Sequence, residues 1–214
     1  MSKKTEKKDS IIFKIITLGN SGVGKTSILR RFIYDNYTED TMATIGVSMS
    51  YKDITLSNGK EIKLKLIDTA GQEKYMALAK TYYKNADGVF FIFGFDDKNS
   101  VESIKMWVNE FNENNKTSGN YVIPRYLIGN KSDIDINQRD VKEDFIEKFR
   151  KEFNIDHYET TSAKDNININ KIFLEISEMI YKNYEKLIGK EQKAIAIDNY
   201  KKDEKNCAQC FSGV

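Results

Sequence analysis

Residues 19–26 read GNSGVGKT and match the pattern G-x-x-x-x-G-K-[ST] at every fixed position. The run 11–18 directly before them is apolar and rich in β-branched residues, which predicts a buried strand. Residues 26–34 directly after them carry apolar side chains at the spacing of one helical face. A strand, this loop and a helix in that order are the context in which the pattern binds nucleotide phosphates, so a chance glycine-rich turn is the weaker interpretation.

The residue types in this loop suit phosphate chemistry. Glycines let backbone N–H groups wrap around a β-phosphate, and the start of the following helix adds positive potential. Lys25 is expected to reach the β- and γ-phosphates, and the hydroxyl of Thr26 is expected to ligate Mg²⁺. The loop does not select the base, because kinases, ATPases and GTPases share it.

The order of apolar and amphipathic segments predicts the fold class. A turn at Asn58-Gly59, where both residues tolerate positive φ, predicts a hairpin. Strands are expected at 11–18, 47–56, 61–67, 88–95 and 121–128 with a sixth before Thr161, and helices at 26–34, 100–111, 141–153 and 169–187. This order predicts an α/β fold: a six-stranded, mainly parallel sheet with one antiparallel edge strand and helices on both faces.

Length and composition fit one domain with tails. The chain has 214 residues, 40% of them hydrophobic, which is enough for a packed core. Its formal net charge of +2 gives no reason to expect a large nucleic-acid surface, and no run of 18 apolar residues occurs. We expect a solvated N-terminal tail at 1–10, the globular domain at 11–187, and a C-terminal tail at 188–214, where polarity rises.

Two short motifs point to guanine as the base. Asn130, Lys131 and Asp133 follow the fifth expected strand, and the carboxylate of Asp133 can accept from both the N1–H and the exocyclic amine of guanine. Adenine has no such donor pair and would leave that carboxylate unpaired. In isolation the motif is also compatible with a solvated turn. The segment 161–164 follows the sixth strand at the same edge of the sheet, where the N–H of Ala163 could donate to the guanine carbonyl.

The segment 68–73 reads DTAGQE at the end of the third strand and suits the sensing of a γ-phosphate. Asp68 would hold Mg²⁺ through water, the N–H of Gly71 could touch the γ-phosphate, and Gln72 would orient the attacking water. Thr44 lies in the loop before the second strand, and its hydroxyl could complete the Mg²⁺ shell when the γ-phosphate is present.

Together these motifs resemble the Ras superfamily of small GTPases over about residues 14–187. The Rab branch fits best, because residues 19–26, 45–47, 72–73 and 82–86 look like Rab signatures. By this resemblance Tyr37 matches the aromatic residue that stacks on guanine. The resemblance implies GTP hydrolysis to GDP, a cycle that controls vesicle traffic and protein transport, and three kinds of partner: an exchange factor, a GTPase-activating protein, and effectors that bind the switch loops near Thr44 and Gln72.

The candidate site residues follow from the motifs and the resemblance. The expected catalytic residues are Gln72 and Lys25, and the expected metal ligands are Thr26, Thr44 and, through water, Asp68. The expected nucleotide-binding residues are Ser21, Gly22, Val23, Gly24, Lys25, Thr26, Ser27, Tyr37, Thr44, Gly71, Asn130, Lys131, Asp133, Ser162, Ala163 and Lys164.

Three positions depart from the Rab pattern and mark a divergent member. Ile67 stands where a typical Rab has tryptophan, Met49 where an aromatic residue is usual, and Gly94 where an aspartate is common. We expect Ile67 and Met49 on the effector-facing surface. No arginine occurs at 35–46 or 70–87, so slow intrinsic hydrolysis is expected, with stimulation in trans by roughly 10³–10⁵-fold.

The only cysteines, Cys207 and Cys210, lie in the last eight residues. Rab proteins usually end in a prenylated cysteine pair, so lipidation of Cys207 and Cys210 and attachment to the cytoplasmic face of an intracellular membrane are expected from the resemblance. The C-a-a-X position is held by Phe211, so a metal or redox pair and two idle thiols stay open as alternatives. A chain without a disulfide framework suits the cytosol.

The sequence bears on three other functions. A kinase or ATPase would need an adenine-compatible site, which Asp133 opposes. A binding module that holds GTP without hydrolysing it stays open, although Gln72 and Thr44 favour an enzyme. A nucleic-acid binder has no motif in its favour. A monomer is expected, because no heptad or long apolar stripe suggests otherwise.

Overall fold

Six strands form one sheet in the order β2-β3-β1-β4-β5-β6. They are β1 (Ile12–Leu18), β2 (Val47–Thr55), β3 (Glu61–Thr69), β4 (Gly88–Gly94), β5 (Arg125–Asn130) and β6 (His157–Thr160). All neighbours pair in parallel except β2 with β3, which are antiparallel. The structure, a computed structural model, describes residues 11–39, 43–71, 76–115, 122–141, 143–153, 155 and 157–210, and for 76–78, 143–144 and 190–210 the backbone alone.

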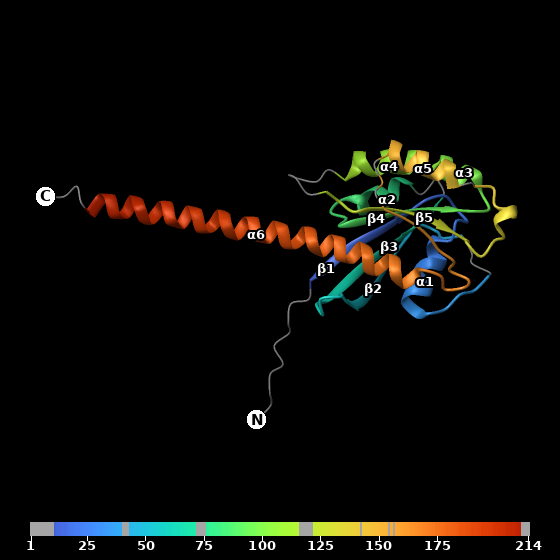
Figure 1. Cartoon of the computed structure of the whole chain (residues 1–214), viewed down its shortest axis with the longest axis horizontal. Coiled ribbons are helices and arrows are strands. Elements are labelled where there is room, and N and C mark those ends of the chain that lie inside the picture. Colours follow the sequence, from blue (N-terminus) through green and yellow to red (C-terminus); the bar gives the residue numbers. More distant parts are fainter. Residues whose placement is uncertain are drawn as a thin grey trace, which may run out of the picture. The chain divides into compact units, whose positions relative to one another are not determined.

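Helices cover both faces of this sheet, as Figure 1 shows. They are α1 (Lys25–Tyr34), α2 (Met76–Tyr83), α3 (Lys98–Glu102), α4 (Ile104–Asn114), α5 (Glu143–Glu152) and α6 (Ile169–Cys210), with a 3₁₀ turn at Ile136–Gln138. Helices α2 to α5 lie on one face, and α1 and the start of α6 lie on the other (Figure 1). This arrangement and the strand order confirm the expected fold class.

The central strand β4 explains why two layers of helices are needed. All seven of its residues are buried, and its side chains alternate between the two faces. Val89, Phe91 and Phe93 belong to the core cluster shared with α2 to α5. Phe90 points to the opposite layer, where its ring meets Phe173 of α6 edge to face at 5.1 Å between centroids. Burying each such side chain stabilises the fold by about 1.5–3 kcal/mol.

Some element bounds differ from the sequence expectation. The expected helix 100–111 is two helices, α3 and α4, and the hydroxyl of Ser103 between them donates to the carbonyl of Asn99 at 2.8 Å. The strand expected at 121–128 begins only at Arg125, because the residue before it is Pro124, which has no N–H for the ladder. Helix α2 had no counterpart among the sequence expectations.

Of the two residues predicted to lie on an effector-facing surface, one is exposed and the other is buried. Met49 on the edge strand β2 is exposed, at 47% of its surface. Ile67 is fully buried and belongs to the core cluster that includes Ala79 and Tyr83 of α2. Its strand, β3, lies between β1 and β2, and its side chain belongs to the core between the sheet and helices α2 to α5 instead of the surface.

The chain divides into two compact units, one up to Ile180 and one from Tyr181. Helix α6 runs to Cys210, beyond the position near 187 where polarity rises. The division into a domain at 11–187 and tails at 1–10 and 188–214 stays a prediction. Within the described residues, no helix combines the length and the apolar character needed to cross a membrane.

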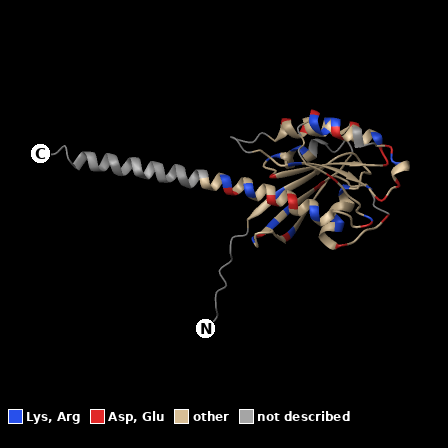
Figure 2. Ribbon diagram, viewed as in Figure 1, with Lys and Arg blue, Asp and Glu red and all other residues tan. Residues whose placement is uncertain are grey.

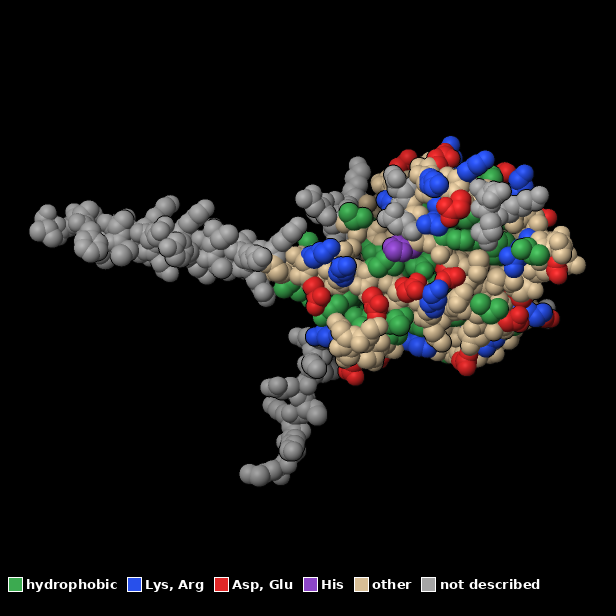
Figure 3. Space-filling model, viewed as in Figure 1, with side chains coloured by type: hydrophobic (Ala, Val, Ile, Leu, Met, Phe, Trp, Pro, Cys, Tyr) green, Lys and Arg blue, Asp and Glu red, His purple; other side chains and the backbone are tan. Residues whose placement is uncertain are grey.

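Residues of both charges are interspersed along the helices of the first unit (Figure 2). On the face shown in Figure 3, lysine and arginine side chains alternate with acidic ones. The fields of neighbouring charges therefore partly cancel there.

Candidate nucleotide-binding site

A cavity of about 360 Å³ opens at the carboxyl edge of the parallel strands. This is the edge at which open parallel sheets bind ligands. Its lining comes from the loops after β1, β3, β5 and β6 and from the segment between α1 and β2: Ser21, Gly22, Gly24, Lys25, Thr26, Ser27, Tyr37, Glu39, Ala43, Thr44, Gly71, Asn130, Lys131, Asp133, Ile134, Ala163 and Lys164.

The phosphate loop needs glycine at position 24 for two reasons. Gly24 has a φ of +93°, which side chains rarely adopt, and it precedes the first residue of α1. A Cβ at this position would lie 2.2 Å from the Nδ2 atom of Asn130. That amide donates to the carbonyl of Val23 at 2.9 Å. The missing side chain thus allows the base-side motif to be tied directly to the phosphate loop.

Lys25 is held at the floor of the cavity. Its side chain is 5% exposed, and its ammonium donates to the carbonyls of Gly19 at 2.8 Å and Asn20 at 2.7 Å. Burial lowers the pKa of Lys25 to about 8, while the nearby charge of Asp68 opposes that shift. An anionic phosphate in the cavity would favour the charged form and raise this pKa again.

We therefore expect nucleotide binding to take up a proton at Lys25. With a free-state pKa of about 8, roughly a tenth of the lysines are neutral at pH 7 and about three quarters at pH 8.5. Affinity should fall as pH rises above 8, because the binding-competent charged form becomes rarer. Calorimetry of GDP binding in buffers of different ionisation enthalpy measures the proton uptake at pH 7 and at pH 8.5. Equal proton uptake at these two pH values contradicts the prediction.

Three oxygen-bearing side chains meet beside Lys25. The Thr26 hydroxyl donates to Oδ2 of Asp68 at 2.7 Å and lies 2.7 Å from the hydroxyl of Thr44. The other carboxylate oxygen of Asp68, Oδ1, is buried and has no hydrogen-bond partner among the residues that the structure describes. Burial raises the pKa of Asp68, and its contacts with Thr26 and Lys25 act in the opposite direction. An unpaired buried anion among hydroxyl oxygens is a donor set that fits Mg²⁺ or its water shell.

Residues expected to read the base converge on Asn130 and Asp133. Asn130 is 2% exposed, and its Oδ1 accepts from the hydroxyl of Thr161 at 3.2 Å and from the N–H of Ala163 at 3.4 Å. The hydroxyl of Ser162 donates to Oδ1 of Asp133 at 2.6 Å, which fixes the plane of that carboxylate. The contact between the Ala163 N–H and Oδ1 of Asn130 is long and therefore weak. This N–H can donate to a better-placed acceptor in the cavity.

Lys131 is oriented by an acid that sequence reasoning overlooked. Its ammonium contacts Asp96 at 2.5 Å, and its backbone has a φ of +67°. Asp96 takes the space beside Gly94, where a Cβ would lie 2.4 Å from its Oδ1. An aspartate at 94, common in the Rab branch, would require the Asp96 side chain to move from this position.

Most of the expected site residues line the cavity, and a few do not. Val23 and Ser162 are buried behind it and support Asn130 and Asp133. Gln72 lies outside the described residues. Sequence reasoning missed Glu39, Ala43 and Ile134. Glu39 pairs with Lys164 at 3.3 Å, and nothing in the spacing of two residues 125 positions apart signals that contact.

The phosphate loop and the residues expected to bind guanine line one cavity. This arrangement is that of a P-loop nucleotide-binding protein of the GTPase class. A family model described as the Ras family matches residues 14–182. Ras-related protein Rab-13 of Rattus norvegicus is 32% identical over 94% of this chain and 97% of its own length. Ras-related protein Rab-10 of Diplobatis ommata is 38% identical over 84% of this chain and 85% of its own length. GTP-binding protein ypt1 of Schizosaccharomyces pombe is 37% identical over 79% of this chain and 80% of its own length. The chain therefore belongs to the Ras family, as a Rab-type small GTPase.

Proposed function

We propose that the cavity binds GTP and GDP with Mg²⁺ and that hydrolysis of GTP switches the loops around Thr44 and Gln72 in vesicle traffic. The observation that carries this proposal is the position of Asn130. Its side chain contacts Val23 in the phosphate loop, Thr161 after β6 and the N–H of Ala163. One buried amide thus joins the phosphate half of the cavity to the base half, which suits a ligand that spans both.

The chain's own residues divide the work of hydrolysis. Lys25 neutralises charge on the β- and γ-phosphates, and Gln72 orients the attacking water. Thr26 and Thr44 would hold Mg²⁺ directly and Asp68 would hold it through water, and the bound ion would supply Lewis-acid stabilisation of the charge on the phosphates. The γ-phosphate holds Thr44 and Gly71 in place, and its loss releases both loops.

The same proposal covers the partners. An exchange factor, a GTPase-activating protein and effectors would act on the segments near Thr44 and Gln72. Arg31 cannot serve as a catalytic arginine, because its guanidinium is engaged with Ala163 and Lys164. An arginine supplied in trans would therefore raise the hydrolysis rate by roughly 10³–10⁵-fold. Lipid on Cys207 and Cys210 would attach the protein to the cytoplasmic face of an intracellular membrane.

Single-turnover hydrolysis of GTP with Mg²⁺, run with competing GDP and ATP, tests this function. We expect slow release of phosphate that GDP blocks and ATP leaves unchanged. Effective competition by ATP would contradict guanine recognition. Tight GTP binding with no hydrolysis would instead support the alternative of a binding module. The Gln72→Leu variant separates chemistry from binding, since it should keep its affinity for GTP and lose hydrolysis.

A further inference from the structure

Arg31 makes a set of contacts that the nucleotide-binding motifs do not account for. It belongs to the last turn of α1, and its side chain is only 15% exposed. Its Nε donates to the carbonyl of Ala163 at 2.9 Å and its Nη2 to the carbonyl of Lys164 at 3.0 Å. Its Nη1 donates to the carbonyl of Asp35 at 3.0 Å. One guanidinium therefore holds two segments that are about 130 residues apart in sequence.

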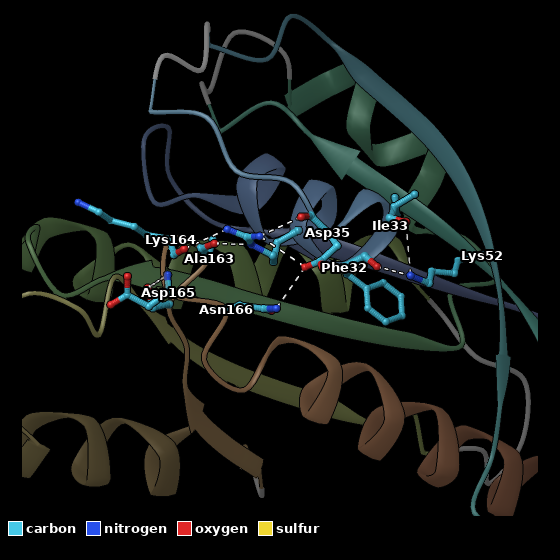
Figure 4. Close-up of polar contacts among 10 residues, drawn as sticks. Phe32, Ile33, Asp35, Lys52, Ala163, Lys164, Asp165 and Asn166 are labelled. Carbon is cyan, nitrogen blue, oxygen red and sulfur yellow. Dashed lines mark hydrogen bonds and ion pairs between the residues drawn. The ribbon is translucent and has the colours of Figure 1, made fainter.

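Both segments lead into the lining of the cavity, which includes Tyr37 from one and Ala163 and Lys164 from the other. The N–H of Ala163 is the group expected to face the guanine carbonyl. Asp35 ends α1 in a left-handed conformation, with its N–H bonded to the carbonyl of Arg31 at 2.9 Å, and Tyr37 follows two residues later. Figure 4 shows Asp35 beside the loop that carries Ala163, Lys164 and Asn166.

A second contact reinforces the join. Nδ2 of Asn166 donates to Oδ1 of Asp35 at 3.2 Å, so the base-side loop also reaches back to the end of α1 (Figure 4). Asn166 has a φ of +57°, a conformation that asparagine tolerates better than most residues. Both sides of the join thus use residues suited to tight turns.

The end of α1 is itself fixed from the opposite side. Lys52 of β2 donates to the carbonyls of Phe32 and, at 3.4 Å, Ile33, and its ammonium lies 4.6 Å from the centroid of the Phe32 ring (Figure 4). That ring stacks on Phe173 of α6 with centroids 3.8 Å apart. Arg31 therefore contacts the loop after β6 from a helix end that is itself held in place. The position of that loop is thereby fixed relative to α1.

We infer that Arg31 is a positioning residue for guanine recognition. By engaging the carbonyls of Ala163 and Lys164 it fixes the loop after β6, and so places the N–H of Ala163, on the preceding peptide, where it meets the six-position oxygen of the base. The inference rests on the proposed binding of guanine nucleotides. Arg31 touches neither base nor phosphate. It acts through the carbonyls of Ala163 and Lys164, which the guanidinium engages with two donors held in one rigid plane.

The test compares three nucleotides that differ at one group. 6-Thio-GDP replaces the six-position oxygen with sulfur, a weaker acceptor, and IDP lacks the exocyclic amine expected to meet Asp133. Dissociation constants for GDP, 6-thio-GDP and IDP are measured for the wild type, Arg31→Met and Arg31→Lys. The matched control is Arg30→Met, which removes the same charge from the exposed neighbouring position on α1.

We expect Arg31→Met to reduce the preference for GDP over 6-thio-GDP by about threefold to tenfold, the size of one neutral hydrogen bond. Its preference for GDP over IDP should stay at the wild-type value, because Asp133 keeps its bond from Ser162. Arg31→Lys, the milder change, should shift the same preference in the same direction, so the test stands even if Arg31→Met does not fold.

Two results would overturn the inference. One is an unchanged preference over 6-thio-GDP in the Arg31 variants, or no such preference in the wild type. The other is an equal loss of both preferences, which marks a general loss of structure. A wild-type protein that binds no guanine nucleotide would instead overturn the proposed function. The dissociation constant of GDP for the wild type is therefore measured before any variant is compared.

Discussion

Asp133→Asn is expected to lower the affinity for GDP by about 10²–10³-fold. The carboxylate of Asp133 can accept from two N–H groups of guanine, and hydrogen bonds to a charged group contribute about 1.5–3 kcal/mol each. Asparagine keeps the shape but offers one acceptor and one donor, so it meets the guanine amine with an N–H of its own. The donor of Ser162, 2.6 Å from Oδ1, orients whichever side chain is present.

The same substitution should improve binding of xanthosine diphosphate. Xanthine carries a carbonyl where guanine has its amine, and this oxygen accepts from the asparagine amide while it repels the aspartate. The measurement is a competition series with GDP, xanthosine diphosphate and ADP on both proteins. ADP should compete weakly against both.

Ser162→Ala serves as the matched control for this exchange of base. It removes the hydroxyl that orients the carboxylate and leaves its charge, so GDP affinity should fall by only about tenfold and xanthosine diphosphate should gain nothing. If the Asp133→Asn protein prefers GDP over xanthosine diphosphate by the same factor as the wild type, Asp133 does not recognise the base.

The parts of the site that could be predicted are those written as contiguous motifs at strand ends. The loop at 19–26 and the segment 161–164 each follow a strand, while Asp68 and the segment 130–133 lie at the carboxyl ends of β3 and β5. Parallel strands bring their carboxyl ends to one edge, so the sequence order alone placed these residues together. The lining of the cavity contains most of them.

The contacts between these motifs could not be predicted, because they join side chains with no common pattern. Arg31 looks in the sequence like one of two adjacent charges on a helix, and only the packing of α1 against the loop after β6 distinguishes it from Arg30. Asp96 contacts Lys131, and no motif in the sequence links these two residues. Ile67 was misplaced because strand periodicity gives two faces and does not say which helix covers each.

Asp68→Asn is expected to abolish most of the effect of Mg²⁺ on nucleotide release. In the wild type, removal of Mg²⁺ with EDTA should speed GDP release by about 10²-fold, since the metal neutralises charge between the phosphates and a carboxylate that is 5% exposed. In the variant, release should already be fast with Mg²⁺ present, and EDTA should change it by about threefold or less. Stopped-flow release of a fluorescent GDP analogue measures both rates.

The geometry separates this metal effect from a loss of folding. Asparagine keeps one oxygen for the hydroxyl of Thr26, which lies 2.7 Å from Oδ2. It also removes a buried charge, whose Oδ1 has no hydrogen-bond partner within the described part of the chain. The nucleotide-free variant should therefore unfold at a temperature close to that of the wild type. Asp87→Asn is the matched control, because this half-buried acid accepts from the N–H of Lys14 at 2.7 Å, just before the first residue of β4. It should keep the full response to EDTA, and an equal response in Asp68→Asn would show that Asp68 does not hold the metal.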